Sequence, residues 1–584
     1  MSKVFAGALV WSLLASAFLL GETAPAKSKP KSTANKDVQT VTQKLEEFQG
    51  QLKQQQAQIA EQQSQIRQLQ QQLQQSNAQL QEQGQQTHQL QSSLQQASQR
   101  ATAAEQTANN LNATVVDMKT STAGAVQSLQ ETQKAVKNLD QPSAVHYKGI
   151  TITPGGYLDA TFITRSRNIN SDVIGSFNSF PFDNTANANL TEFRVSARQS
   201  RFTLLSEGKI GNTKLSGYYE IDFLGAAPTA NQVETNSFTP RQRQLWGQVE
   251  FSNGLTLNVG QMWSLLTTDR KGMATRAEFI PTTIEGSYVI GWDYTRQTSF
   301  RVTKNFSNKT WAGFELANPE TTASASYTPP DLFGLNNSTN ALFPTGVLVP
   351  SCCGTPVITN GVSTNLAPDI IAKVAFEPDW GHYEIKGLGR FFRDRIKGQN
   401  NVSYGGGLGA AAVLPLVAKK VDFMIEGLAG SGIGRYGAAN GADVTIRPDG
   451  RLIPIHAIHI MGGVEFHPQP KLDVYIYGGD EYYRRAPYVN PVNSKEAAGY
   501  GSSLAVNTGC NFEVAPKGTS CQAQNKDMYE ATGGFYYRFY KGPFGTFQYG
   551  MQLAFLHRTT WSGVGGAPQG SDVVGLTSIR YVLP

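Results

Sequence analysis

The stretch that decides the fold is residues 215–223, LSGYYEIDF, in which apolar and polar side chains alternate. Tyr219 and Ile221 fall on one face, whereas Glu220 and Asp222 fall on the other. A period of two is the period of a β-strand, because successive side chains of a strand point to opposite faces. The run has about the nine to eleven residues that a tilted strand needs to cross a bilayer. It therefore predicts a strand of a transmembrane barrel, with one face toward lipid and the other toward a channel.

The same alternation returns at intervals along the rest of the chain. We expect strands at about 148–165, 190–207, 213–225, 240–252, 254–266, 287–304, 309–318, 369–378, 382–396, 401–418, 419–433, 456–467, 470–485, 527–541, 544–560 and 572–583. Short turns and long loops alternate between them, and only the connection 397–400 is short where a long loop is due. Short turns at one rim and long loops at the other are typical of outer-membrane barrels. The sequence thus predicts an all-β barrel of about 16 antiparallel strands over residues 146–584, rather than a soluble β-sandwich with its shorter strands.

Residues 1–26 have the parts of a secretory signal peptide. Lys3 precedes an apolar segment over residues 4–20, and the sequence APA at 24–26 offers a small-residue cleavage site. The alternative is an uncleaved membrane anchor. Residues 27–37 are polar and are expected to form a flexible linker.

A seven-residue repeat of apolar side chains occupies residues 38–140. One seam position takes, among others, Leu45, Leu52, Ile59, Ile66, Leu73 and Leu80. A sustained heptad repeat winds helices into a left-handed supercoil, so we predict a coiled coil in the periplasm. The alternative is a disordered glutamine-rich segment. A lone helix of this kind would expose its apolar seam, and the repeat therefore implies that copies of the chain associate.

Charge and cysteine content narrow the function. The formal net charge of +6, from 50 basic and 44 acidic residues, is too balanced for a nucleic-acid-binding protein. We find no nucleophile–base arrangement and no glycine-rich phosphate loop, so we expect neither an enzyme nor a cofactor. Cys510 and Cys521 are expected to form a disulfide within one long loop, whereas the pairing of Cys352 and Cys353 stays open. Neither cysteine pair has a histidine at ligand spacing, which makes a metal site less favoured.

Two short segments carry a resemblance to a known family. Residues 197–202, ARQSRF, and 260–264, GQMWS, resemble segments of the DcaP-like group, trimeric outer-membrane porins that take up dicarboxylates and are loosely related to phosphate-selective porins. That group is similar in layout, with a signal peptide, a coiled coil and then the barrel. The C-terminus departs from the pattern, because such barrels usually end in Phe or Trp and this chain ends YVLP. The resemblance implies a homotrimer with one pore per subunit and passive uptake of small, anionic solutes.

Charged residues on the polar phase of the strands are the candidates for selectivity. Arg194, Arg198 and Arg201 lie close together on one strand and form the best cluster, with Arg301 and Arg390 on the same phase of later strands. Rings of Arg and Lys favour anions in a narrow pore. A break in the alternation near residue 199 predicts a bulge, and the bulge decides whether the last arginine of the cluster faces solute or lipid. Acidic residues are as frequent on this phase, so the alternative is a mixed lumen whose charges pair with each other.

Two loops could narrow the pore. The loop 267–286 folds into the pore in many porins, and here it carries four charged candidates, Asp269, Arg270, Lys271 and Arg276. The loop 319–368 is the longest and is the alternative. Periodicity does not choose between them.

The leading hypothesis is an outer-membrane porin for passive uptake of small anionic, carboxylate-like solutes. Its expected partners are further copies of itself, outer-membrane lipid and the solutes. The alternative is a structural protein that ties the envelope together, with the barrel as an anchor and the coiled coil reaching the peptidoglycan.

Overall fold

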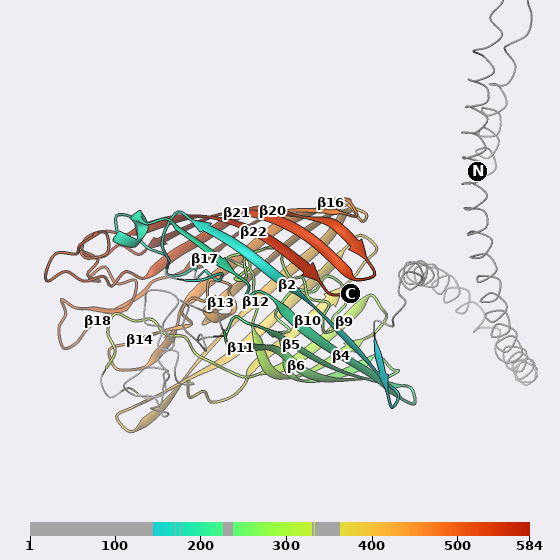
Figure 1. Cartoon of the computed structure of the whole chain (residues 1–584). Coiled ribbons are helices and arrows are strands. Elements are labelled where there is room, and N and C mark those ends of the chain that lie inside the picture. Colours follow the sequence, from blue (N-terminus) through green and yellow to red (C-terminus); the bar gives the residue numbers. More distant parts are fainter. Residues whose placement is uncertain (1–143, 170, 176, 226–237, 330–331, 333–362) are drawn as a thin grey trace, which may run out of the picture. The chain divides into compact units, whose positions relative to one another are not determined.

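In the computed structural model the described residues are 144–169, 171–175, 177–225, 238–329, 332 and 363–584. They form a closed antiparallel barrel (Figure 1). The main sheet has 18 strands. Of these, β1 (Val145–Tyr147) is a short extension that pairs with β2 (Ile150–Arg165), and β3 (Glu192–Ser196) and β4 (Arg201–Ile210) are two halves of one interrupted strand. The predicted sixteen-stranded wall is therefore confirmed. The predicted signal peptide, linker and coiled coil lie outside the described residues, as do Cys352 and Cys353.

Each wall strand pairs with its neighbours in sequence, and the last strand, β22 (Gln569–Val582), closes the ring by pairing with β2. The remaining wall strands are β5 (Thr213–Asp222), β6 (Arg241–Glu250), β7 (Leu255–Trp263), β8 (Arg296–Asn305), β9 (Thr310–Ala317), β10 (Asp369–Phe376), β11 (His382–Ile396), β12 (Gln399–Val417), β13 (Val421–Ser431), β16 (His456–Gln469), β17 (Leu472–Tyr483), β20 (Asn525–Gly542) and β21 (Gly545–Thr560). The loops add the 3₁₀ turns η1 (Ala186–Asn189) and η2 (Gly434–Tyr436) and two small hairpins, β14 (Val444–Ile446) with β15 (Leu452–Pro454) and β18 (Ala486–Val489) with β19 (Ala497–Tyr500).

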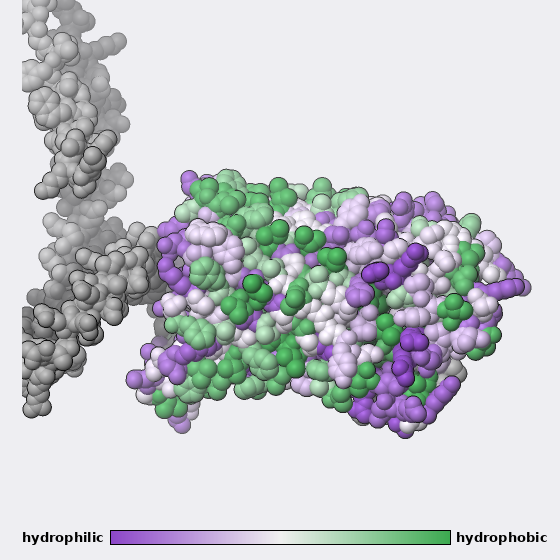
Figure 2. Space-filling model, turned by 180° about the vertical axis from the view of Figure 1, so that it is seen from behind, coloured by the Kyte–Doolittle hydropathy of each residue, from purple (hydrophilic) through white to green (hydrophobic). Residues whose placement is uncertain are grey.

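The alternation read from the sequence separates an outer from an inner face. On β11, His382, Glu384 and Lys386 are buried inside the barrel, whereas Ile385 between them is 69% exposed. The exposed apolar side chains of the other strands include Leu158, Phe193, Leu245, Val259, Leu408, Ile476 and Leu553. Apolar side chains cover much of the wall in Figure 2, and hydrophilic ones gather at its ends. Such a wall suits hydrocarbon on the outside, because apolar side chains face outward and the strands pair with each other all round the ring.

The predicted register break lies between β3 and β4. Ser196 stands opposite Thr161 and Arg201 stands opposite Tyr157, so five steps on one strand face four steps on β2. The extra residue forms a bulge, so that even-numbered instead of odd-numbered side chains face outward on β4. Phe202 is consequently exposed on the outer face, and Arg201 points to the inside.

One predicted strand is wrong in its extent. We expected a strand over 287–304, but β8 begins only at Arg296. The preceding residues 287–295 belong to the connection between β7 and β8, which therefore covers 264–295. The apolar run of these residues resembles a strand that is buried on both sides. Periodicity alone cannot distinguish such a strand from a buried loop.

No helix among the described residues is long and apolar enough to cross a membrane.

Candidate pore constriction

The inner loop, which is the connection 264–295, lies inside the barrel. Leu265, Phe279 and Trp292 are fully buried although they belong to a loop. They join a continuous apolar core with inward side chains of the wall, such as Met461 and Tyr477. Of the two loops that the sequence offered, this one narrows the lumen within the described part of the chain; most of the other, residues 333–362, falls outside it.

Acidic side chains of the far wall hold the backbone of the inner loop. Four of them accept a backbone N–H at 2.9–3.1 Å: Glu384 from Asp269, Glu426 from Asp293, Glu481 from Gly291 and Glu530 from Ile290. A loop buried away from water must satisfy its N–H groups, and a carboxylate makes a strong acceptor for them. The lumenal acids that the alternation predicted therefore act here as anchors for the loop.

Two buried lysines hold the same loop through its carbonyl groups. Lys373 donates to the carbonyl oxygen of Thr267 at 2.8 Å and to the carboxylate of Asp269 at 2.7 Å. Lys386 donates to the carbonyl oxygen of Leu266 at 2.7 Å. The wall thus holds four backbone N–H groups and two backbone carbonyl groups of the loop, which fixes the loop inside the barrel.

The loop backbone also touches the wall backbone directly. Gly291 has a φ of +85°, and a Cβ atom there would lie 2.0 Å from the carbonyl oxygen of Ile460. On the facing strand, a Cβ at Gly479 would lie 1.8 Å from the carbonyl oxygen of Ile290. Only glycine allows this approach at either position.

The wall opposite these anchors carries partly exposed arginines. The three predicted residues of the cluster lie here with Arg241, each beside a carboxylate: Arg194 with Glu192 at 3.3 Å, Arg198 with Asp172 at 3.1 Å, Arg201 with Glu220 at 3.5 Å and Arg241 with Asp222 at 2.7 Å. Their side chains keep between 16% and 39% of their surface exposed. The charges are paired, as the mixed-lumen alternative expects, but the guanidinium groups remain within reach of a solute.

The other predicted residues divide into buried and accessible ones. Arg301 and Arg390 are buried; Arg301 donates to Glu315 at 2.6 Å and to the carbonyl oxygen of Trp263. Arg270 forms a double hydrogen bond with Glu465 at 2.7 and 2.8 Å. Asp269 is buried as the partner of Lys373. In contrast, the side chain of Lys271 is 81% exposed, and the exposed Arg276 lies 4.9 Å above the ring of Tyr218.

Sequence reasoning missed three buried charged residues of the lumen. Arg243 fell on the apolar phase of its strand, but a register shift opposite Glu220 turns it inward to meet that carboxylate and Asp222. Lys373 was missed because β10, DIIAKVAF, has apolar residues at both its inward and its outward positions, so the sequence shows no polar face there. His459 is also buried, with its Nδ1 atom 2.7 Å from Asp293 of the inner loop. A one-residue change of phase between RQRQ and the following alternation was the available signal for the first of these.

One group of side chains has ligand types suited to a metal ion. Asp422, Glu465 and His467 bring one ligand atom each to within 4.8 Å of one another. Both oxygens of Glu465 already accept hydrogen bonds from Arg270, and His467 is 2.7 Å from Asp473. The group is best described as an ionic network at the short-turn end of the lumen. The predicted pair Cys510 and Cys521 lies in the long loop after β19, with its sulfur atoms 2.13 Å apart.

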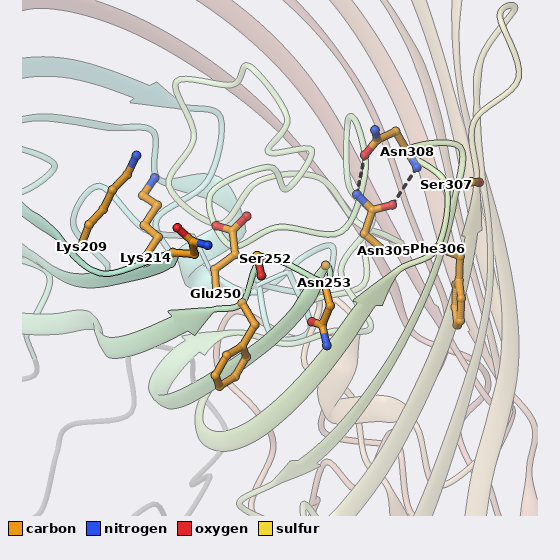
Figure 3. Close-up of a pocket in the computed structure, with 12 residues that line it drawn as sticks. Lys209, Lys214, Glu250, Ser252, Asn253, Asn305, Phe306, Ser307 and Asn308 are labelled. Carbon is orange, nitrogen blue, oxygen red and sulfur yellow. Dashed lines mark hydrogen bonds between the residues drawn. The ribbon is translucent and has the colours of Figure 1, made fainter. Parts of the chain in front are cut away.

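A separate cavity of about 510 Å³ lies at the rim of short turns and not in the lumen (Figure 3). Lys209, Lys214 and Glu250 line it together with the turn residues Asn305 and Asn308, which hydrogen bond to each other. Its lining is polar and belongs to the connections between strands.

The inner loop contains an acidic side chain that favours its protonated form. Glu278 stands opposite Asp269 across an antiparallel bridge, and one of its carboxylate oxygens has no hydrogen-bond partner among the described residues. Burial, and then repulsion by Asp269, raise the pKa of Glu278 to about 7.

This raised pKa predicts a pH dependence of the loop. A carboxyl whose pKa is higher in the folded state stabilises that state below its ordinary pKa, and the contribution is lost as pH rises through the folded pKa. We therefore expect the current noise of single channels to increase between about pH 5 and about pH 8, as the loop loosens. Glu278→Gln should remove most of this increase. An unchanged pH profile in the variant would contradict the assignment to Glu278.

The barrel is similar to solved structures of outer-membrane channels. The outer-membrane channel DcaP of Acinetobacter baumannii matches with a TM-score of 0.51 and 13% identity, over 75% of this chain and 100% of that one. The anion-selective porin of Comamonas acidovorans and OprB of Pseudomonas putida match with TM-scores of 0.38 and 0.40 and identities of 11% and 10%, over 74% of this chain and 100% and 94% of theirs. No protein-family model and no curated protein matches the sequence. The resemblance to the DcaP-like group is therefore confirmed at the level of the fold: the chain shares the barrel architecture of an outer-membrane channel.

Proposed function

We propose that this protein is an outer-membrane porin through which small anionic, carboxylate-like solutes pass passively. The observation that carries the proposal is the asymmetry of the lumen. Its acidic wall holds the inner loop, and its arginine-rich wall keeps guanidinium groups partly exposed.

The asymmetry favours anions for an electrostatic reason. The carboxylates of Glu426, Glu481 and Glu530 point at backbone N–H groups, whose partial positive charges compensate them. Lys386 adds a full positive charge beside Glu426 at 3.1 Å. A solute in the lumen therefore meets acids that are already engaged. It also meets partly exposed arginines such as Arg194 and Arg201, a residue type that can hold a carboxylate through two parallel hydrogen bonds.

Two further arginines strengthen the positive wall. Arg276, on the inner loop, and Arg296, at the start of β8, have no carboxylate within ion-pair distance among the described residues. Arg296 lies 4.7 Å from the ring of Trp263, which stabilises a cation without neutralising it. Both arginines therefore add positive charge that no carboxylate of the described residues offsets within ion-pair distance.

The test is ion selectivity in planar bilayers. In a salt gradient, the wild type should show a reversal potential with the sign of an anion-selective channel. The triple variant Arg194→Gln, Arg198→Gln, Arg201→Gln should shift it toward cations, because it removes three positive charges and leaves the carboxylates of Glu192, Asp172 and Glu220 each with one cationic partner fewer. Lys420→Gln, in the short turn before β13, is the control and should leave the potential unchanged. Cation selectivity in the wild type, unaltered in the triple variant, would contradict the proposal.

Liposome swelling would then identify the solute class. We expect faster uptake of dicarboxylates than of neutral sugars of similar size, and the difference should shrink in the triple variant. Equal uptake rates for charged and neutral solutes would instead indicate a general porin without a preference for anions.

The oligomeric state and the tether function depend on the heptad repeat at residues 38–140. We infer a homotrimer in the outer membrane, with the coiled coil in the periplasm, from that repeat and from the family resemblance. Deleting residues 38–139 separates the two functions. Loss of the trimer with uptake retained per barrel would show an assembly role. A stable trimer in a loosened envelope would favour the attachment to peptidoglycan.

A further inference from the structure

The hairpin of β11 and β12 extends beyond the neighbouring strands. Its turn is Lys397 and Gly398, both with positive φ (49° and 77°), which is the tight two-residue connection that broke the rule of alternating loop lengths. The last residue pair that joins β11 to β10 is Gly389 with Ile370, so residues 390–396 pair with β12 alone. Its strands are drawn in yellow in Figure 1.

The two faces of this extension differ. Phe392, Asp394 and Ile396 are buried on the inner side, where Leu452 of β15 packs and donates its N–H to Asp394. Since side chains alternate along a strand, Arg393 must lie on the outer face.

That outer face continues the apolar wall and then becomes basic. Leu408 and Tyr404 are 73% and 72% exposed on β12, and Tyr404 packs edge-on against Phe391 with ring centroids 5.9 Å apart. Arg393 and Arg395 follow Phe391 at the next two outward positions of β11. Aromatic rings of this kind sit at the boundary between hydrocarbon and headgroups, so the arginines lie at headgroup level.

These arginines differ from those in the lumen. Neither Arg393 nor Arg395 has a carboxylate within 4.0 Å in the described part of the chain, and Arg395 donates only to the amide oxygen of Asn400 at 2.9 Å. Asp394, which stands between them in the sequence, points inward to Leu452. Two unneutralised guanidinium groups therefore stand side by side above an aromatic pair and face the membrane.

We propose that this face, Phe391, Arg393, Arg395 and Tyr404, binds the phosphate groups of a glycolipid in the outer leaflet. The aromatic rings contact the acyl and sugar region, and each guanidinium can hold a phosphate through two parallel hydrogen bonds. A lipid is the occupant because the basic pair is continuous with the lipid-facing wall and carries the charge that complements a phosphorylated headgroup. The inference is independent of the solute that the pore transports.

The test compares lipid binding to the full-length protein in neutral detergent, measured by native mass spectrometry or by fluorescence titration. The probes are lipid A with two phosphate groups and the same lipid without phosphate. The double variant Arg393→Gln, Arg395→Gln should weaken binding of the phosphorylated lipid by about fivefold for each arginine removed, as expected for basic residues near an anionic membrane surface. Binding of the dephosphorylated lipid should not change. Lys209→Gln with Lys420→Gln, two exposed lysines at the short-turn rim, is the matched control.

Three results would overturn the proposal. The first is equal binding of phosphorylated lipid A by the wild type and the double variant. The second is displacement of the lipid by inorganic phosphate at the same concentration, which would assign the face to a soluble anion. The third is a changed oligomeric state of the variant with unchanged lipid binding, which would show that the face meets a second copy of the chain. Both arginines are on the surface, so heat-dependent mobility in a gel should confirm that the variant folds.

Discussion

Gly479→Ala is expected to release the inner loop and to raise the single-channel conductance severalfold. The added methyl group would lie 1.8 Å from the carbonyl oxygen of Ile290. Neither atom can avoid the clash by a side-chain rotation, because the Cβ is fixed to one backbone and the oxygen belongs to the other. The wall strand is held by ladders on both sides, to β16 and to β20, whereas the loop has one layer of anchors. The loop should therefore be the part that moves, at a cost of about 1–3 kcal/mol, which is usual for inserting a methyl group into a packed interior.

The neighbouring residue supplies the control for this experiment. A Cβ at Gly478 would meet its nearest atom, the carbonyl oxygen of Glu530, at an ordinary 3.6 Å. Gly478→Ala should therefore keep the conductance and the current noise of the wild type. If both variants conduct equally, the contact between Gly479 and Ile290 does not limit the pore.

Arg390→Met is expected to lower the free energy of unfolding of the barrel strongly. The guanidinium is buried between Asp369 and Asp443 and also donates to the carbonyl oxygens of Gly432 and Glu320. Removing one partner of a buried ion pair leaves a buried charge without compensation, which costs about 3–5 kcal/mol. The loops that carry Asp443 and Glu320 should detach from the wall as a result.

Unfolding by urea in detergent, followed by tryptophan fluorescence, would measure the loss. Arg395→Met on the same strand is the control, because that side chain is exposed and hydrogen bonds only to Asn400. Its unfolding midpoint should remain close to that of the wild type. Similar midpoints for both variants would mean that the network around Arg390 contributes little to stability.

The local chemistry of the chain was sufficient to predict the wall. Strand β11 was predicted with its observed ends, 382–396, because apolar outward and polar inward side chains alternate along most of its length. The bulge near residue 199 was also visible, since a change of phase in the alternation is a local signal. Prediction failed at 287–295, where a buried loop has the same apolar composition as a strand.

The sequence by itself determined that the chain forms a closed barrel and, except where a bulge shifts the phase as at Arg243, which side chains point inward, because alternation depends only on neighbours along the strand. Only the tertiary structure decided which inward charges remain available. Glu384 receives the N–H of a residue 115 positions away, and Arg270 meets a carboxylate 195 positions away. Such pairings depend on the path of the inner loop across the lumen, and no local pattern records that path. The same path makes Arg390 a structural residue and leaves Arg194 within reach of a solute.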